Sequence, residues 1–67
     1  MTITDSQLAR LDLVRMRLMV EAEHYLRGAA ATDTSPELRS VLTKLGARCI
    51  TAADDLNDLY RDIRDQP

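Results

Sequence analysis

The residues that most restrict the fold of this chain are the few that can interrupt a helix. The 67 residues include two glycines and two prolines, and one of the prolines ends the chain. Gly28 and Pro36 lie together in the segment GAAATDTSPE, where threonine, serine and aspartate also gather. Such a cluster marks a turn between two regular elements. We therefore expect an all-α protein with one turn, a single helical-hairpin domain over residues 1–67.

The first helix is expected at about 5–27. Thr4 or Asp5 can cap its start, and Thr4 with Gln7 fits a capping box, in which each side chain hydrogen-bonds to the backbone N–H of the other. Gly28 suits the position just after a helix, where a left-handed residue commonly ends it. Both signals are local, so they can be judged from the sequence alone.

The second helix is expected at about 36–64. Thr34 or Ser35 can cap it, and the missing N–H of Pro36 costs nothing in a first helical turn. Glu37 is favourable at the positive end of the helix dipole.

The second helix carries an apolar stripe with alternating steps of four and three residues, the heptad spacing of packed helices. Its members are Leu38, Leu42, Leu45, Cys49, Ala52, Leu56, Leu59 and Ile63. A matching stripe on the first helix contains Leu8, Leu11, Arg15, Leu18, Ala22, Tyr25 and Ala29. Two helices joined by a short connection pack antiparallel. We therefore expect a hairpin core of Leu8, Leu11, Leu18, Leu42, Leu45, Cys49, Leu56 and Leu59. Folding at the turn would place Leu11 opposite Leu56, Leu18 opposite Cys49 and Ala22 opposite Leu45.

A second apolar strip on the first helix, formed by Leu13, Met16 and Val20, has no neighbour within a hairpin. Leaving these side chains in water loses about 1.5–3 kcal/mol each relative to burial. A chain this short is also marginally stable alone. Since two-fold homodimers are the commonest closed assemblies, we expect this strip to be an oligomer or partner interface. Two hairpins would then form an antiparallel four-helix bundle.

Three residues leave alternatives open. Arg15 falls in the core stripe, where its stem could pack beside Ala52 while its charge reaches water and meets Asp55 or a carboxylate of another chain. It could also fix the register of packing, or bind an anionic ligand. Gly46 lies inside the second helix, either because another helix approaches closely or as a tolerated defect. Cys49 is most simply a small buried apolar residue.

The sequence offers little chemistry for catalysis. Glu21 and His24 have the Glu-x-x-His spacing of di-iron bundles, but they lie on the polar side of the first helix, and no inward carboxylate of the second helix completes a site. We expect no catalytic residue, no cofactor and no metal, and hence not an enzyme. The single cysteine indicates a reducing compartment, so we expect a cytoplasmic protein. No stretch is long and apolar enough for a membrane span.

Two functional classes remain. The first is a protein–protein interaction or regulatory accessory module that forms a homodimer. The second is nucleic-acid binding, since Arg10 and Arg17 lie one heptad apart on one helix face and could contact phosphates. The net charge of −2 disfavours a general polyanion binder. The absence of tryptophan and phenylalanine disfavours the stacking of bases on aromatic side chains. The segment LNDLYRDI is similar to the Rop family of plasmid copy-number regulators. That resemblance implies a dimeric antiparallel four-helix bundle that binds paired RNA loops.

Overall fold

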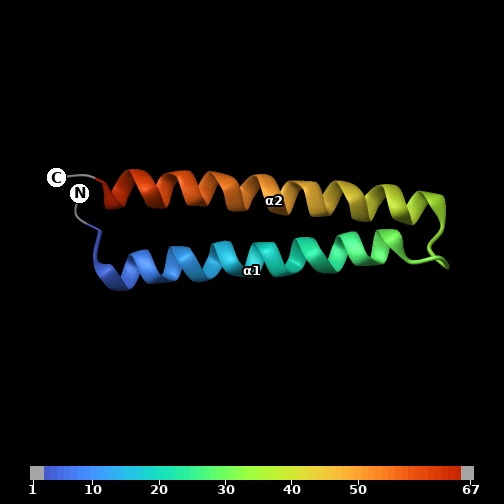
Figure 1. Cartoon of the computed structure of the whole chain (residues 1–67), viewed down its shortest axis with the longest axis horizontal. Helices are drawn as coiled ribbons and strands as arrows, with labels where there is room; N and C mark the ends of the chain where they lie inside the picture. The colour runs from blue at the N-terminus through green and yellow to red at the C-terminus, as the bar shows by residue number, and fades with distance from the viewer. Residues whose placement is uncertain (1–2, 66–67) are drawn as a thin grey trace.

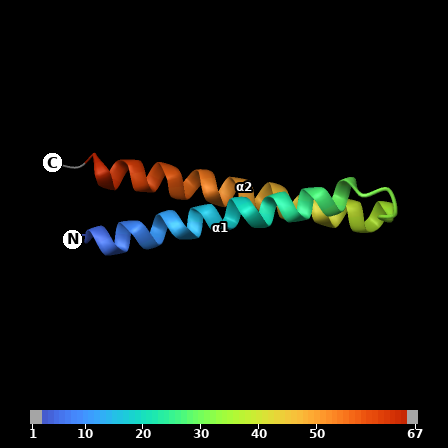
Figure 2. The same cartoon turned by 60° about the horizontal axis from the view of Figure 1, so that its bottom comes forward.

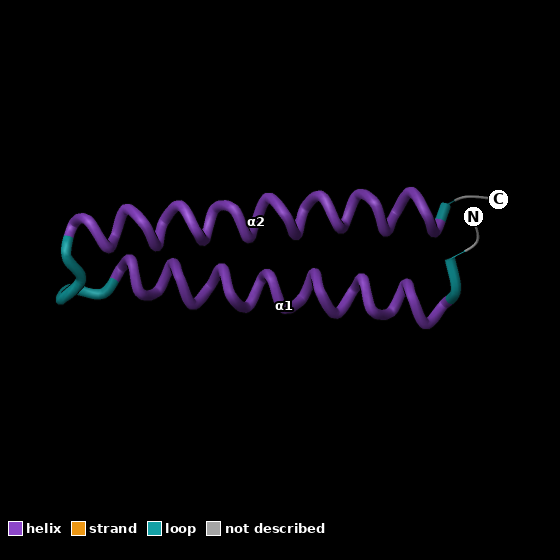
Figure 3. Tube along the Cα trace, turned by 180° about the vertical axis from the view of Figure 1, so that it is seen from behind, coloured by secondary structure: helices purple, strands orange, loops and turns teal. Residues whose placement is uncertain are grey.

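The chain folds into two antiparallel helices. The computed structural model describes residues 3–65 and contains α1 (Asp5–Ala30) and α2 (Pro36–Arg64). A short connection joins them at one end of the molecule, so both termini of the described chain lie at the other end (Figures 1 and 3). The Cα trace measures 51 × 15 × 14 Å, and a second view shows that the helices are inclined to one another (Figure 2). The predicted all-α hairpin is confirmed.

Both helices begin where the sequence predicted. The backbone N–H of Gln7 donates to Thr4 Oγ1 at 3.2 Å, and the Thr4 N–H donates to Gln7 Oε1 at 2.9 Å, which completes the capping box. For α2 the cap is Ser35 rather than Thr34, because Ser35 Oγ accepts from the N–H of Leu38 at 3.2 Å. Pro36 occupies the first helical turn.

The predicted end of α1 was wrong. The helix continues through Gly28 to Ala30, and no glycine within residues 3–65 has a positive φ. Donors from outside α1 replace a glycine cap. Thr34 Oγ1 donates to the Gly28 carbonyl at 2.6 Å, and Arg39 Nε donates to the Ala29 carbonyl at 2.8 Å. Because these donors satisfy the last carbonyls, the chain needs no left-handed residue there.

Small residues form the contact between the helices. The buried residues are Ala22, Ala29, Gly46 and Ala53, and within residues 3–65 no large side chain is fully buried. A Cβ built on Gly46 would lie 2.8 Å from Leu26 Cγ and 3.5 Å from the Ala22 carbonyl oxygen. Gly46 is therefore a point of close helix approach rather than a tolerated defect.

Gly28 has a similar role near the turn. A Cβ on it would lie 3.1 Å from Leu42 Cδ1. With Gly46 against Ala22 and Leu26, these contacts fall within about one helical turn of the predicted pairing. The order of residues along the two helices is as expected, but α2 is displaced along α1 by a few residues.

The rotation of α2 also differs from the prediction. Leu38 and Leu59, expected in the contact stripe, are 50% and 49% exposed, while Gly46 and Ala53 are buried. The contact follows a second stripe with the same alternating steps, and all of its members are buried or half-buried: Leu42, Gly46, Cys49, Ala53, Leu56, Tyr60 and Ile63. Small residues allow backbones to approach, whereas leucines at the closest points would hold the helices apart. Leu38, Leu45 and Leu59, which belong to the predicted stripe but not to this one, therefore lie at the side of the contact.

Candidate interaction surface

Large apolar side chains are exposed along both helices. Exposure of these residues runs from 39% for Leu26 to 62% for Leu13. They are Leu13, Val14, Met16, Met19, Val20, Leu26, Leu38, Val41 and Leu59. Since the fully buried part of the hairpin consists of small residues, most of its apolar surface lies outside the core.

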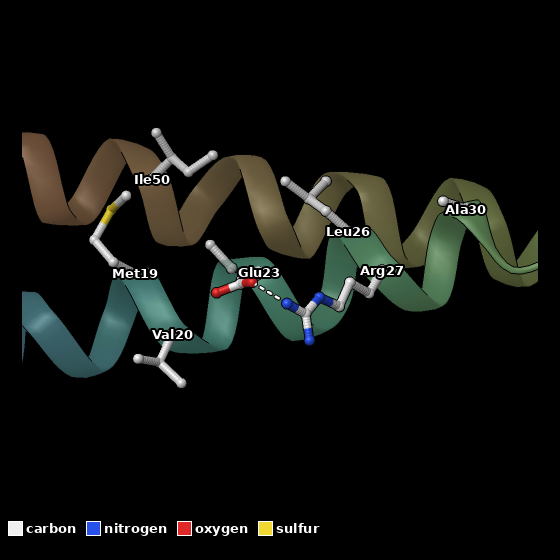
Figure 4. Close-up of a pocket in the computed structure, with 8 residues that line it drawn as sticks. Met19, Val20, Glu23, Leu26, Arg27, Ala30 and Ile50 are labelled. Carbon is white, nitrogen blue, oxygen red and sulfur yellow. Dashed lines mark hydrogen bonds and ion pairs between the residues drawn. The ribbon is translucent and has the colours of Figure 1, made fainter.

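The first group is the predicted strip of Leu13, Met16 and Val20, here called the outer strip. All three side chains are more than half exposed. At about 100° per residue they lie roughly opposite Ala22 and Ala29, the residues that face α2. Figure 4 shows Val20 pointing away from α2. The strip belongs to α1, with Leu13 and Met16 on the side remote from α2, while Val20 also lines the groove that Ile50 of α2 borders.

The second group lines a shallow groove along one side of the hairpin. Its apolar lining includes Met19, Leu26 and Ala30 of α1 with Ile50 of α2 (Figure 4). At its rim the Arg27 guanidinium donates to the Glu23 carboxylate in an ion pair. With this pair as its only charged lining, the groove offers an apolar surface with no free charge to orient a polar ligand.

The third group lies on the opposite side of the hairpin and is here called the leucine edge. It comprises Leu38, Val41, Leu45, Ala52 and Leu59, all on α2. Leu45 and Ala52 directly precede Gly46 and Ala53, so they lie about 100° around the helix from those buried residues. They turn away from the groove, because Ile50, which lines it, lies on the other side of Gly46 around α2.

Val14 extends the leucine edge from α2 onto α1. On α1 it lies about 120° from Leu26, beyond Ala22, and is therefore on the side away from the groove. The side chain of Val14 is 48% exposed. Leu45 and Leu59 of this edge were predicted in the hairpin core, but Leu59 is 49% exposed and Leu45 is half-buried. The available signal was the second heptad stripe through Gly46 and Ala53.

Arg15 has a partner within its own helix. Its Nε and Nη2 donate to Asp12 Oδ1 at 3.1 and 2.7 Å, and its side chain is 33% exposed. The predicted combination of a packed stem and a charge that reaches the surface describes this position. Within the hairpin the acceptor is Asp12, one turn earlier, rather than Asp55.

The residues of the nucleic-acid alternative are also at the surface. Arg10 and Arg17 are exposed on α1, as is His24 one heptad further on. Within residues 3–65 neither arginine forms an ion pair. Glu21 is exposed as well, and the described residues contain no group of three potential metal ligands from histidine, cysteine, aspartate and glutamate.

Residues 3–65 contain no helix with both the length and the apolar character that a membrane span requires. No family model, curated protein or solved structure matches the chain. The resemblance of LNDLYRDI to the Rop family therefore stays a prediction.

Proposed function

We propose that this protein is a small non-enzymatic interaction module that self-associates through its exposed apolar surface and acts by binding other proteins. One observation carries the proposal. Nine large apolar side chains are 39–62% exposed over two helices whose buried residues are three alanines and a glycine. Exposed apolar surface of this extent is typical of protein–protein contacts.

The surface area supports association. The accessible surface is 5367 Å² for a chain of 7.5 kDa. A compact monomer of that mass has about 4,200 Å². The excess, roughly 1,100 Å², is similar to the approximately 800 Å² that each partner buries in a standard interface. A second layer of helices would cover the surface that a two-helix hairpin leaves in water.

The available surfaces favour binding over catalysis. The groove beside Leu26 and Ile50 is apolar and shallow, and its charged lining is one ion pair. General acid–base or nucleophilic chemistry needs polar groups that converge on a substrate. An apolar side chain such as Met19 can contact another helix but cannot transfer a proton.

Sedimentation equilibrium of the full chain at micromolar concentration tests this proposal. The expected result is a mass of twice 7.5 kDa that falls on dilution. A single species of 7.5 kDa over the whole range would overturn the proposal. Circular dichroism at each concentration would show whether the helices depend on association, as they do in obligate dimers.

A second candidate, a regulator that binds RNA as the Rop resemblance implies, is favoured by one observation. Arg10, Arg17 and His24 are exposed one heptad apart on α1, and a dimer would present two copies of this row. Binding of a paired RNA stem-loop whose affinity falls steeply with salt, and is lost on joint Arg10→Ala and Arg17→Ala substitution, would support it. Salt-independent or absent binding would exclude it.

A further inference from the structure

We propose that a second copy of this chain packs on the leucine edge with the two α2 helices antiparallel, so that Arg48 of each copy pairs with Asp55 of the other. This inference rests on the self-association proposed above and names the face and the arrangement. It follows from the apolar ridge of α2, from the charges beside it, and from the symmetry of both about Ala52.

The ridge is regular and runs along most of α2. Leu38, Leu45, Ala52 and Leu59 recur every seven residues and span about 31 Å of helix. Leu38 and Leu59 are half exposed, as is Val41 beside them. A seven-residue repeat keeps such a ridge in line over several turns, which is the condition for packing against another helix.

Ala52 is the smallest residue of the ridge and lies at its centre. A two-fold axis through Ala52, perpendicular to α2, would place the two Ala52 residues opposite one another. It would also bring Leu45 of each copy opposite Leu59 of the other. A small residue at the crossing with leucines on both sides lets two helices approach and interdigitate.

The charges that border the ridge follow the same symmetry. Arg48 and Asp55 lie on the outer flank of the ridge, both exposed, at positions about equally far before and after Ala52. They are about 10.5 Å apart along the helix and cannot pair within one chain. Neither takes part in an ion pair within residues 3–65. The same two-fold axis brings Arg48 of each copy to Asp55 of the other, which gives two equivalent ion pairs.

The charges also select between two dimers. If both turns lay at the same end, the helices would be parallel, and the flanks that carry Arg48 and Asp55 would lie on opposite sides of the contact. These residues of the two copies could not pair there. The antiparallel dimer places both flanks on the same side, which brings the opposite charges together.

The outer strip does not fit a four-helix bundle in this way. Leu13 and Met16 lie on the side of α1 remote from α2, and only Val20 adjoins the groove that Ile50 of α2 lines, so a copy docked on the strip would contact mainly α1. The leucine edge is continued on α1 by Val14 and thus spans both helices. A core shared by four helices requires a face to which each helix contributes.

Charge reversal tests the arrangement in the full-length chain. Arg48→Asp and Asp55→Arg should each raise the dimer dissociation constant at least tenfold in low salt, because each places like charges at both contacts. The double variant should return it to within about threefold of the parent, since the pairs are restored in reverse. Asp54→Arg is the matched control, because it reverses the same charge one residue away from Asp55. Asp54 is exposed and lies on the side of α2 opposite the leucine edge, so this change should leave the dissociation constant unchanged.

Crosslinking gives a second measurement that does not depend on charge. In a Cys49→Ala background, Ala52→Cys should form a disulfide between copies. Leu59→Cys should not, because the antiparallel arrangement separates the two positions by about 21 Å. If both charge reversals left the dissociation constant unchanged, or if Leu59→Cys formed a disulfide between copies, the antiparallel arrangement would be wrong, although the chain would still self-associate. A chain that stays monomeric would overturn self-association itself.

Discussion

The outer strip of α1 and the leucine edge of α2 are both apolar, but they differ in exposure and in what they can build. All three side chains of the strip are more than half exposed, whereas Leu45 and Ala52 of the edge are half-buried. The outer strip, with Met16 at its centre, lies on one helix and faces away from the other. The leucine edge lies beside the contact between the helices, with Arg48 and Asp55 on its flank. Exposure alone therefore does not identify an association surface. Its position relative to the hairpin partner and the charges around it decide what can dock.

The largest expected effect comes from a charge placed on the leucine edge. Leu59→Asp should weaken dimerisation more than 100-fold, because an unpaired carboxylate would be buried opposite Leu45 of the second copy. Leu59 is 49% exposed within one hairpin, so the hairpin itself should tolerate the change. Sedimentation equilibrium measures the loss, and circular dichroism at high concentration checks the helices. Unchanged dimerisation would remove the leucine edge as the contact.

The next effect is expected at Gly46, where the close approach of the two helices sets the rotation of α2. Gly46→Val should lower the free energy of unfolding by about 2 kcal/mol, because its side chain would collide with Leu26 and push the helices apart. Ala47→Val, one residue along and exposed, is the matched control and should cost less than about 1 kcal/mol through helix propensity. Urea unfolding at one protein concentration compares the two. Equal losses would mean that the close approach at Gly46 contributes little.

A smaller effect is expected at the turn, which fixes the register of the two helices. Arg39→Met should lower the free energy of unfolding by about 1 kcal/mol, since the Ala29 carbonyl loses its donor while the apolar stem is kept. Thermal or urea unfolding gives the value. Lys44→Met, which removes an exposed charge from α2 without removing a hydrogen bond to the turn, separates the loss of this bond from a general loss of charge. A similar cost for both would argue against the cap.

The smallest effect is expected from a charge placed on the outer strip. Met16→Asp should leave the dimer dissociation constant within about twofold of the parent, because the side chain is exposed in the monomer and stays exposed in the proposed dimer. Measured beside Leu59→Asp, it compares the two surfaces with the same introduced charge. Dissociation by Met16→Asp alone would show that the outer strip, as the sequence analysis expected, is where the copies meet.

Local signals accounted for much of the fold. The capping box of Thr4 and Gln7 and the cap at Ser35 each join residues three apart, so the sequence contains the complete interaction. The turn around residues 31–35 follows from composition in the same way. These features determine that the chain forms two helices and where each begins.

The candidate surface could be predicted only in part. The strip of Leu13, Met16 and Val20 was recognised from helical periodicity, which needs no partner. The leucine edge was not, because α2 carries two heptad stripes, one through Leu45 and Ala52 and one through Gly46 and Ala53. Both have the same spacing, and hydrophobicity favours the first.

The sequence by itself determined the hairpin: one turn, two capped helices and an apolar side on each. Only the tertiary structure decided where α1 ends and which side of α2 it meets. The donors that cap the last carbonyls of α1 come from Thr34 and Arg39, beyond the helix that they terminate. The rotation of α2 depends on how closely the two backbones can approach, which is a property of the pair and of neither helix alone. That rotation buries Gly46 and Ala53 and leaves Leu38 and Leu59 at the surface.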